Sequence, residues 1–217
     1  MGCDSRPPPP RPTTHAFIWP LPSSYTNGST LLGVTFTPSA SFFVGPTGSA
    51  LLKAAFGRYS SLTFPHTTDP SAHLDLQATA GTITSLVVTV DSTAEDFPQL
   101  ETDESYKLSV TAASATLHAK TVFGALRGLE TFSQLVVFDF NTGGYTLPYA
   151  PWTITDTPRF PHRGLMIDSA RHFLPIKTIK KVINALPYAK LNVLHWHMVR
   201  KFQRWSACFS FQVCVQF

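Results

Sequence analysis

Residues 162–199 constrain the fold of this chain most, because they place an amphipathic stretch between two apolar runs. The first run, Leu165 to Ile167, ends at Asp168, a polar residue where a buried parallel strand would give way to its loop. The second run covers 191–198. A strand, a crossover helix and a second strand of this kind form one right-handed parallel unit. The apolar face of the helix is expected to carry Ile179, Val182, Ile183 and Leu186.

Four lysines are expected on the remaining, solvent-facing side of this helix, and Pro187 is expected to end or kink it. They add to a charge asymmetry: residues 1–158 hold seven Lys or Arg against twelve Asp or Glu, whereas residues 159–217 hold ten against one. Because the lysines share one face and no aromatic residues interleave with them, we expect no nucleic-acid partner. The lysines are Lys177, Lys180, Lys181 and Lys190.

No run of the sequence approaches the roughly 18 apolar residues of a membrane span, so no membrane span is expected.

The second apolar run also carries two histidines. Period-2 alternation puts His195 and His197 on one face of the strand and Trp196 on the other, where a core position is expected. Two histidines spaced in this way could ligate zinc. No third acidic, Cys or His ligand lies near them in the sequence, so we expect no metal site.

The sequence before this segment predicts a small domain of mixed α and β structure. Apolar residues recur at helical spacing over 51–59 and 122–136, and they alternate with polar or small residues over 86–90 and 106–110. Two helices that could cover one face of a sheet suggest an α+β domain.

Prolines divide the chain further. Pro148, Pro151 and Pro158 punctuate the connection into the second segment, which places a domain boundary near 158. The amino-terminal stretch is polar and rich in proline, which predicts disorder, and it has no apolar core of the kind that a secretory signal needs. The expected parts are a disordered N-terminus (1–16), an α+β domain (17–158), the strand–helix–strand segment (159–199) and a divergent tail (200–217).

Several long runs resemble one family. The chain resembles the β-N-acetylhexosaminidases, the family 20 glycoside hydrolases, and especially their lysosomal and plant vacuolar branch. The resemblance implies an α/β fold, in which the N-terminal α+β domain precedes a TIM (β/α)8 barrel that is incomplete here, with only its first β-α-β unit present. The runs that carry it are Trp19-Pro20-Leu21-Pro22, Asp103-Glu104-Ser105-Tyr106, 121–135, Ala150-Pro151-Trp152 and 162–199.

The resemblance also implies an activity. Such enzymes release terminal non-reducing N-acetylglucosamine or N-acetylgalactosamine, and the substrate's own acetamido oxygen attacks the anomeric carbon with retention of configuration. An Asp-Glu pair on a later barrel strand assists, and no cofactor is implied. Asp168 is the single carboxylate after Asp156, so no catalytic residue is assigned and the chain is expected to be inactive alone. The alternative is a non-catalytic glycan-binding or subunit-interaction fragment.

Three residues are expected to bind substrate by their match to the family. Arg163 matches the arginine that holds sugar hydroxyls, and its planar fork of donors suits vicinal hydroxyls. Its alternative interpretation is an internal salt bridge, with Asp168 as a candidate partner. Asp168 and Arg171 match positions near the strand end, where a structural role is equally compatible, and His197 is expected to shape the sugar site.

The resemblance further implies partners and a compartment. The expected partner is a glycan or glycoconjugate with a terminal N-acetylhexosamine, and family members also form homo- or heterodimers. Family membership suggests lysosome, vacuole or secretion, although no signal peptide is visible. After Val199 the family continues with acidic residues, whereas this chain has Arg200-Lys201 and then an alternating apolar run that predicts an aggregation-prone strand.

Overall fold

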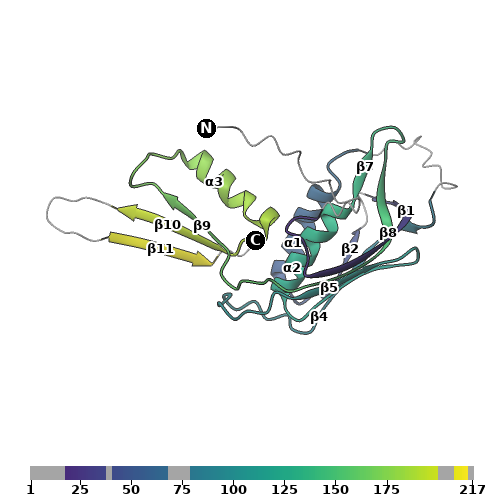
Figure 1. Ribbon diagram of the computed structural model, residues 1–217, viewed down its shortest axis with the longest axis horizontal. Coiled ribbons are helices and arrows are strands. Elements are labelled where there is room, and N and C mark those ends of the chain that lie inside the picture. The colour runs from purple at the N-terminus through teal and green to yellow at the C-terminus, as the bar shows by residue number, and fades with distance from the viewer. Residues whose placement is uncertain (1–17, 38–40, 68–78, 200–207, 215–217) are drawn as a thin grey trace, which may run out of the picture.

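The computed structural model describes residues 18–37, 41–67, 79–199 and 208–214. The predicted disorder of 1–16 and most of the divergent tail lie outside the described residues. The described part consists of a large sheet with two helices and a smaller sheet with one helix, and the two are joined by the connection after Asp156 (Figure 1).

The large sheet is mixed, and its strand order is β2-β4-β6-β5-β8-β1-β3, with β7 paired to β8. The long strand β8 lies between β1 and β5 and is antiparallel to both. Its inward positions, such as Trp152 and Ile154, are buried and alternate with exposed ones. The strands are β1 (Ser24–Val34), β2 (Phe43–Val44), β3 (Thr82–Ile83), β4 (Leu86–Val90), β5 (Tyr106–Val110), β6 (Ala115–Ala119), β7 (Val137–Asp139) and β8 (Gly144–Asp156).

Two helices, α1 (Ala50–Thr63) and α2 (Val122–Leu135), cover one face of this sheet (Figure 1). Each begins at a hydroxyl residue whose side chain accepts a hydrogen bond from the first turn, which satisfies a backbone donor that the helix leaves unpaired. Helix α2 is buried over nearly its whole length, and Leu129 and Phe132 lie fully inside the core. The predicted α+β layer is confirmed.

The smaller sheet contains the predicted strand–helix–strand unit. Strand β9 (Gly164–Asp168) pairs in parallel with β10 (Val193–Val199), and α3 (Ile176–Ala185) with the 3-10 turn η1 (Pro187–Ala189) connects them. As expected, Ile179 and Leu186 face the sheet, where they pack with Ile167 and Leu194. The other edge of β10 pairs antiparallel with β11 (Cys208–Cys214). None of the helices described is both long and apolar enough to cross a membrane.

Candidate functional site

The carboxyl ends of β9 and β10 bring two predicted site residues together. The parallel register makes Asp168 and His197 direct neighbours, and the Ser169 N–H donates to the His197 carbonyl (3.2 Å). The Asp168 carboxylate accepts from the backbone N–H groups of Ala170 (2.9 Å) and Arg171 (3.0 Å), so it also shapes the turn after its strand.

These contacts favour the charged form of the Asp168 carboxyl group. The Arg171 backbone hydrogen bond holds the pKa of the Asp168 carboxyl below its ordinary value, and the charges of His197 and Arg171 act in the same direction. Asp168 is therefore ionised at neutral pH, and it offers an acceptor beside an imidazole and an exposed arginine. Such a set of groups can bind hydroxyls.

Trp196 connects the turn after β9 with the small core around α3. Its indole N–H donates to the Ser169 hydroxyl (2.9 Å), and its ring packs against the cluster around α3. The hydrogen bond ties Trp196 to the turn after β9. The packing of its partly buried ring agrees with the expected position of Trp196 beside the core.

Arg163 lies at the opposite end of β9, immediately before the strand. Its Nε donates to the Lys190 carbonyl (2.9 Å), its Nη1 donates to the Phe160 carbonyl (2.8 Å), and its Nη2 forms an ion pair with Glu104. Its own N–H donates to Asn192 Oδ1 (2.9 Å). All three guanidinium nitrogens thus have protein acceptors.

The five residues of β9 separate Arg163 from Asp168 by about 16 Å at the usual rise per residue. Sugar binding by Arg163 stays a prediction, as it does for Asp168 and His197. The ion pair considered as the alternative does form, although its partner is Glu104 of the N-terminal layer and not Asp168.

No group of three or more His, Cys, Asp or Glu residues that could hold a metal ion occurs within the described ranges. The expectation that the protein uses no metal or cofactor stays a prediction.

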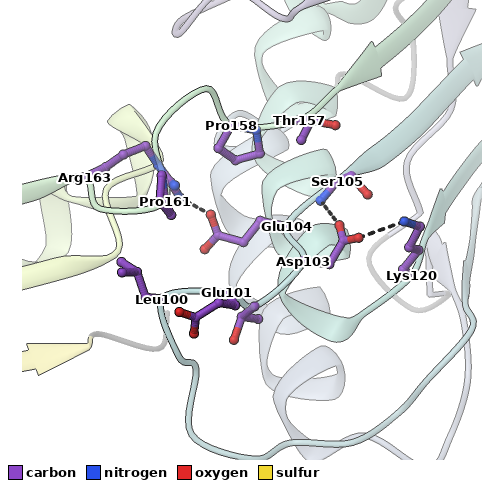
Figure 2. A pocket seen from close by; sticks show the side chains of 11 residues that line it. Leu100, Glu101, Asp103, Glu104, Ser105, Lys120, Thr157, Pro158, Pro161 and Arg163 are labelled. Atoms are coloured by element: carbon purple, nitrogen blue, oxygen red, sulfur yellow. Dashed lines mark hydrogen bonds and ion pairs between the residues drawn. The ribbon is translucent and has the colours of Figure 1, made fainter.

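A cavity of about 310 Å³ lies between the loop before β5 and the connection after β8 (Figure 2). Figure 2 shows Arg163 pointing from the connection toward Glu104, while Asp103 points the other way, toward Ser105 and Lys120. The cavity is lined by Leu100, Glu101, Thr102, Asp103, Glu104, Ser105, Lys120, Thr157, Pro158, Pro161 and Arg163.

The adjacent carboxylates in this cavity have structural partners. Asp103 accepts from the Ser105 N–H (2.8 Å) and from Lys120 Nζ (2.9 Å). Hydrogen bonding to the Ser105 side chain, then to Lys120 and the Ser105 backbone, lowers the pKa of Asp103 to about 2. Glu104 accepts from Arg127 (2.9 Å) through one oxygen and from Arg163 through the other. A carboxylate held by two guanidinium groups is poorly suited to protonate a glycosidic oxygen. The carboxylates of Asp103 and Glu104 are therefore held in structural contacts.

The predicted position of Lys190 was wrong. It was expected on the solvent face of the helix, but its exposed fraction is 4% and it lies beyond η1 in the left-handed backbone region (φ 52°). The helical periodicity that placed it ends at Ala185, and the turn that follows directs its side chain into the N-terminal layer. Asp156 and Tyr106, which receive it there, were also missed, because alternation shows only that they face inward.

Comparison with known proteins agrees with this architecture. The family profile described as "beta-acetyl hexosaminidase like" matches residues 18–135, just over half of the chain, and the profile "Glycosyl hydrolase family 20, catalytic domain" matches residues 160–207. The chain belongs to the family 20 β-hexosaminidases. The first profile covers most of the large layer, and the second covers the β9–α3–β10 unit.

Individual members of this family are similar to the chain over most of its length. Beta-hexosaminidase 1 of Arabidopsis thaliana is 44% identical over 194 residues, which cover 84% of this chain and 36% of that protein. Beta-hexosaminidase subunit beta of Felis catus is 42% identical over 199 residues, which cover 85% of this chain and 35% of that protein. The chitobiase structure from Flavobacterium johnsoniae superposes with a TM-score of 0.61 at 26% identity, over 84% of this chain and 27% of that one. The chain thus spans about a third of the length of the curated relatives it matches.

Proposed function

We propose that the chain serves β-N-acetylhexosaminidase chemistry by supplying the N-terminal domain (17–158) and the first two strands of the sugar-binding barrel (159–199). The ligand is the terminal non-reducing N-acetylglucosamine or N-acetylgalactosamine of a glycan or glycoconjugate. The observation that carries the proposal is the pairing of Asp168 with His197 at the carboxyl ends of two parallel strands. In (β/α)8 enzymes the active site lies at this end of the strands.

The geometry suggests how these residues would hold a sugar. Asp168 can accept from one hydroxyl, and His197 can donate or accept depending on its tautomer. Arg171 lies in the same turn and is exposed, so its planar fork of donors can reach a pair of vicinal hydroxyls. For Arg163, the contacts described above favour the structural interpretation over the predicted sugar contact.

We propose binding without turnover for the chain as written. Substrate-assisted hydrolysis uses the acetamido oxygen as nucleophile, but it still needs an acid to protonate the departing oxygen. Asp168 is the single carboxylate after Asp156, and its lowered pKa, caused first by the Arg171 backbone hydrogen bond, makes it a poor proton donor. No residue of this chain is therefore assigned to proton donation.

A second candidate is a subunit-interaction fragment, in line with the dimers expected from the family. One observation favours it: the large apolar side chains of Met166, Phe173 and Ile176 in the second part of the chain are each strongly exposed. Exposed apolar area is used in contacts between proteins.

The test is ligand-observed saturation-transfer NMR of the purified chain with N-acetylglucosamine, alongside hydrolysis of its 4-methylumbelliferyl β-glycoside. Binding without turnover is expected, and Asp168→Asn or His197→Ala should weaken binding at least about tenfold, because the first removes the charge from the acceptor and the second removes the imidazole that contacts the sugar. Asp91→Asn and His118→Ala are matched controls, since these residues form an exposed Asp–His pair (2.9 Å) on the large sheet.

Two outcomes would contradict the proposal. Turnover that a hexosaminidase inhibitor abolishes would overturn the non-catalytic assignment. Absence of binding, or equal losses in the site and control variants, would overturn the sugar site and leave the interaction fragment. A concentration-dependent increase in mass in analytical ultracentrifugation, removed by Met166→Lys, would then support that second candidate.

A further inference from the structure

Two buried ion-pair sites join the N-terminal layer to the base of the β9–β10 sheet. In the first, Glu104, with an exposed fraction of 6%, lies between Arg127 of α2 and Arg163 of the connection. Both arginine side chains are largely withdrawn from solvent. Glu104 thus binds one cation from each part of the molecule.

In the second site, Lys190 is the cation that crosses between the two parts. Its Nζ donates to Asp156 Oδ2 (3.2 Å) and to the Tyr106 hydroxyl (2.9 Å), and it lies 5.1 Å from the centre of the Tyr106 ring. Burial lowers the pKa of the Lys190 ammonium, and the Asp156 charge opposes that shift. Asp156 is further fixed by the Ser23 N–H (3.0 Å).

The buried charges balance only when both parts are present. The N-terminal layer buries three carboxylates, on Glu104, Glu130 and Asp156, but among its described residues it buries one cation, Arg127. Arg163 and Lys190, from the other part, bring the cations to three. Because an unpaired charge in the interior is costly, the carboxylates favour this docking position over others.

The two sites are linked to each other and to both strands. Arg163 precedes β9 directly and donates to the carbonyl of Lys190, which lies three residues before β10. Asn192 also ties the bases together, since its side chain accepts from the Arg163 N–H and donates to the Pro161 carbonyl (2.8 Å). A shift at either ion pair is therefore transmitted to the starts of both strands.

We propose that Lys190 and Arg163 are positioning residues that hold the bases of β9 and β10 on the carboxylates Asp156 and Glu104, and so set the placement of Asp168 and His197 at the far ends of these strands. The docking of the β9–β10 sheet on the N-terminal layer is inferred from the contacts alone. The effect of this docking on sugar binding rests on the proposed function.

The test is hydrogen–deuterium exchange of the full chain. Lys190→Met should make the amides of β9 and β10 exchange at least about tenfold faster, because it leaves Asp156 buried without its cation, while β4 and β6 keep their protection. The matched control is Lys120→Met, which breaks an exposed ion pair with Asp103 (2.9 Å). The control should exchange like the unmodified chain.

The double variant Lys190→Met with Asp156→Asn separates charge pairing from packing. It should regain most of the lost protection, since no uncompensated charge remains. If Lys190→Met alone fails to fold and the double variant folds, the proposal also holds. Unchanged exchange in Lys190→Met, or a double variant that exchanges as fast as the single one or fails to fold with it, would overturn the proposal. N-acetylglucosamine binding, measured separately, tests the proposed function, because the exchange results do not depend on it.

Discussion

Tyr59 shows how one hydroxyl keeps a carboxylate in place inside the N-terminal layer. Its buried hydroxyl donates to Glu130 Oε2 (2.9 Å), and Glu130 also accepts from Gln134 Nε2 (2.8 Å). Burial, and then the charge of Glu130, raise the pKa of Tyr59, so the phenol stays a donor over the whole working pH range.

Tyr59→Phe is expected to lower the free energy of unfolding by about 1–3 kcal/mol, because the buried carboxylate loses a donor that water cannot replace. Urea denaturation measures this. Tyr188→Phe is the control, since Tyr188 is exposed, and its effect should stay within about 0.5 kcal/mol. Equal midpoints for the two variants would contradict the assignment.

Asp103 gives a prediction for pH. Its folded-state pKa of about 2 lies below the unfolded value of roughly 3.9, so its contribution to stability is fully present above the unfolded pKa and is lost as pH falls through the folded one. Asp103→Asn should therefore be less stable than the unmodified chain at pH 7, and the difference should shrink between about pH 4 and 2. Urea midpoints against pH test this, and a constant difference would argue against it.

For single residues the sequence predicts some positions and not others. Asp168 and His197 could be placed near strand ends because each lies where a short apolar run ends, while their role in sugar binding stays a prediction. The burial of Lys190 could not be predicted, because its pairing with Asp156 joins residues 34 positions apart through a left-handed turn. Nothing in local periodicity encodes such a contact.

Helix α2 depends on a close approach to the sheet. A Cβ on Gly124 would lie 2.3 Å from the Ser105 carbonyl oxygen, a backbone atom beside Glu104. A Cβ on Gly128 would lie 2.2 Å from Leu117 Cδ1, a side-chain atom of the buried core. The two glycines therefore differ in what must move.

Gly124→Ala is expected to destabilise the protein by about 1–3 kcal/mol, because the backbone before β5 must shift. Gly128→Ala should cost less, since it displaces a side chain and not the backbone before β5. Thermal unfolding of the two variants makes the comparison. The explanation is wrong if Gly128→Ala proves the more harmful.

The β9–α3–β10 unit was predictable as an element because all of its signals are local: two apolar runs, a helical stripe and a proline that follows the helix. The order of the large sheet was not. Alternation assigns faces to residues such as Ile154, but it does not show that β8 lies between β1 and β5. Those neighbours are set by packing between distant segments.

For the whole molecule, the charge asymmetry seen in the sequence gains a structural meaning. The acidic first part and the basic second part meet at Glu104 with Arg163 and at Asp156 with Lys190, so part of the imbalance is compensated inside the interface. The sugar site proposed at Asp168 and His197 lies at the other end of the strands that this interface holds.

Sugar binding at the ends of β9 and β10 is tested most directly by titrating the isotopically labelled chain with N-acetylglucosamine and following the backbone amide NMR shifts. Saturable shifts are expected at Asp168, Arg171 and His197, with the amides of Glu104 and Arg163 unchanged. Shifts centred on the cavity beside Glu104, or none at the ends of β9 and β10, would contradict it.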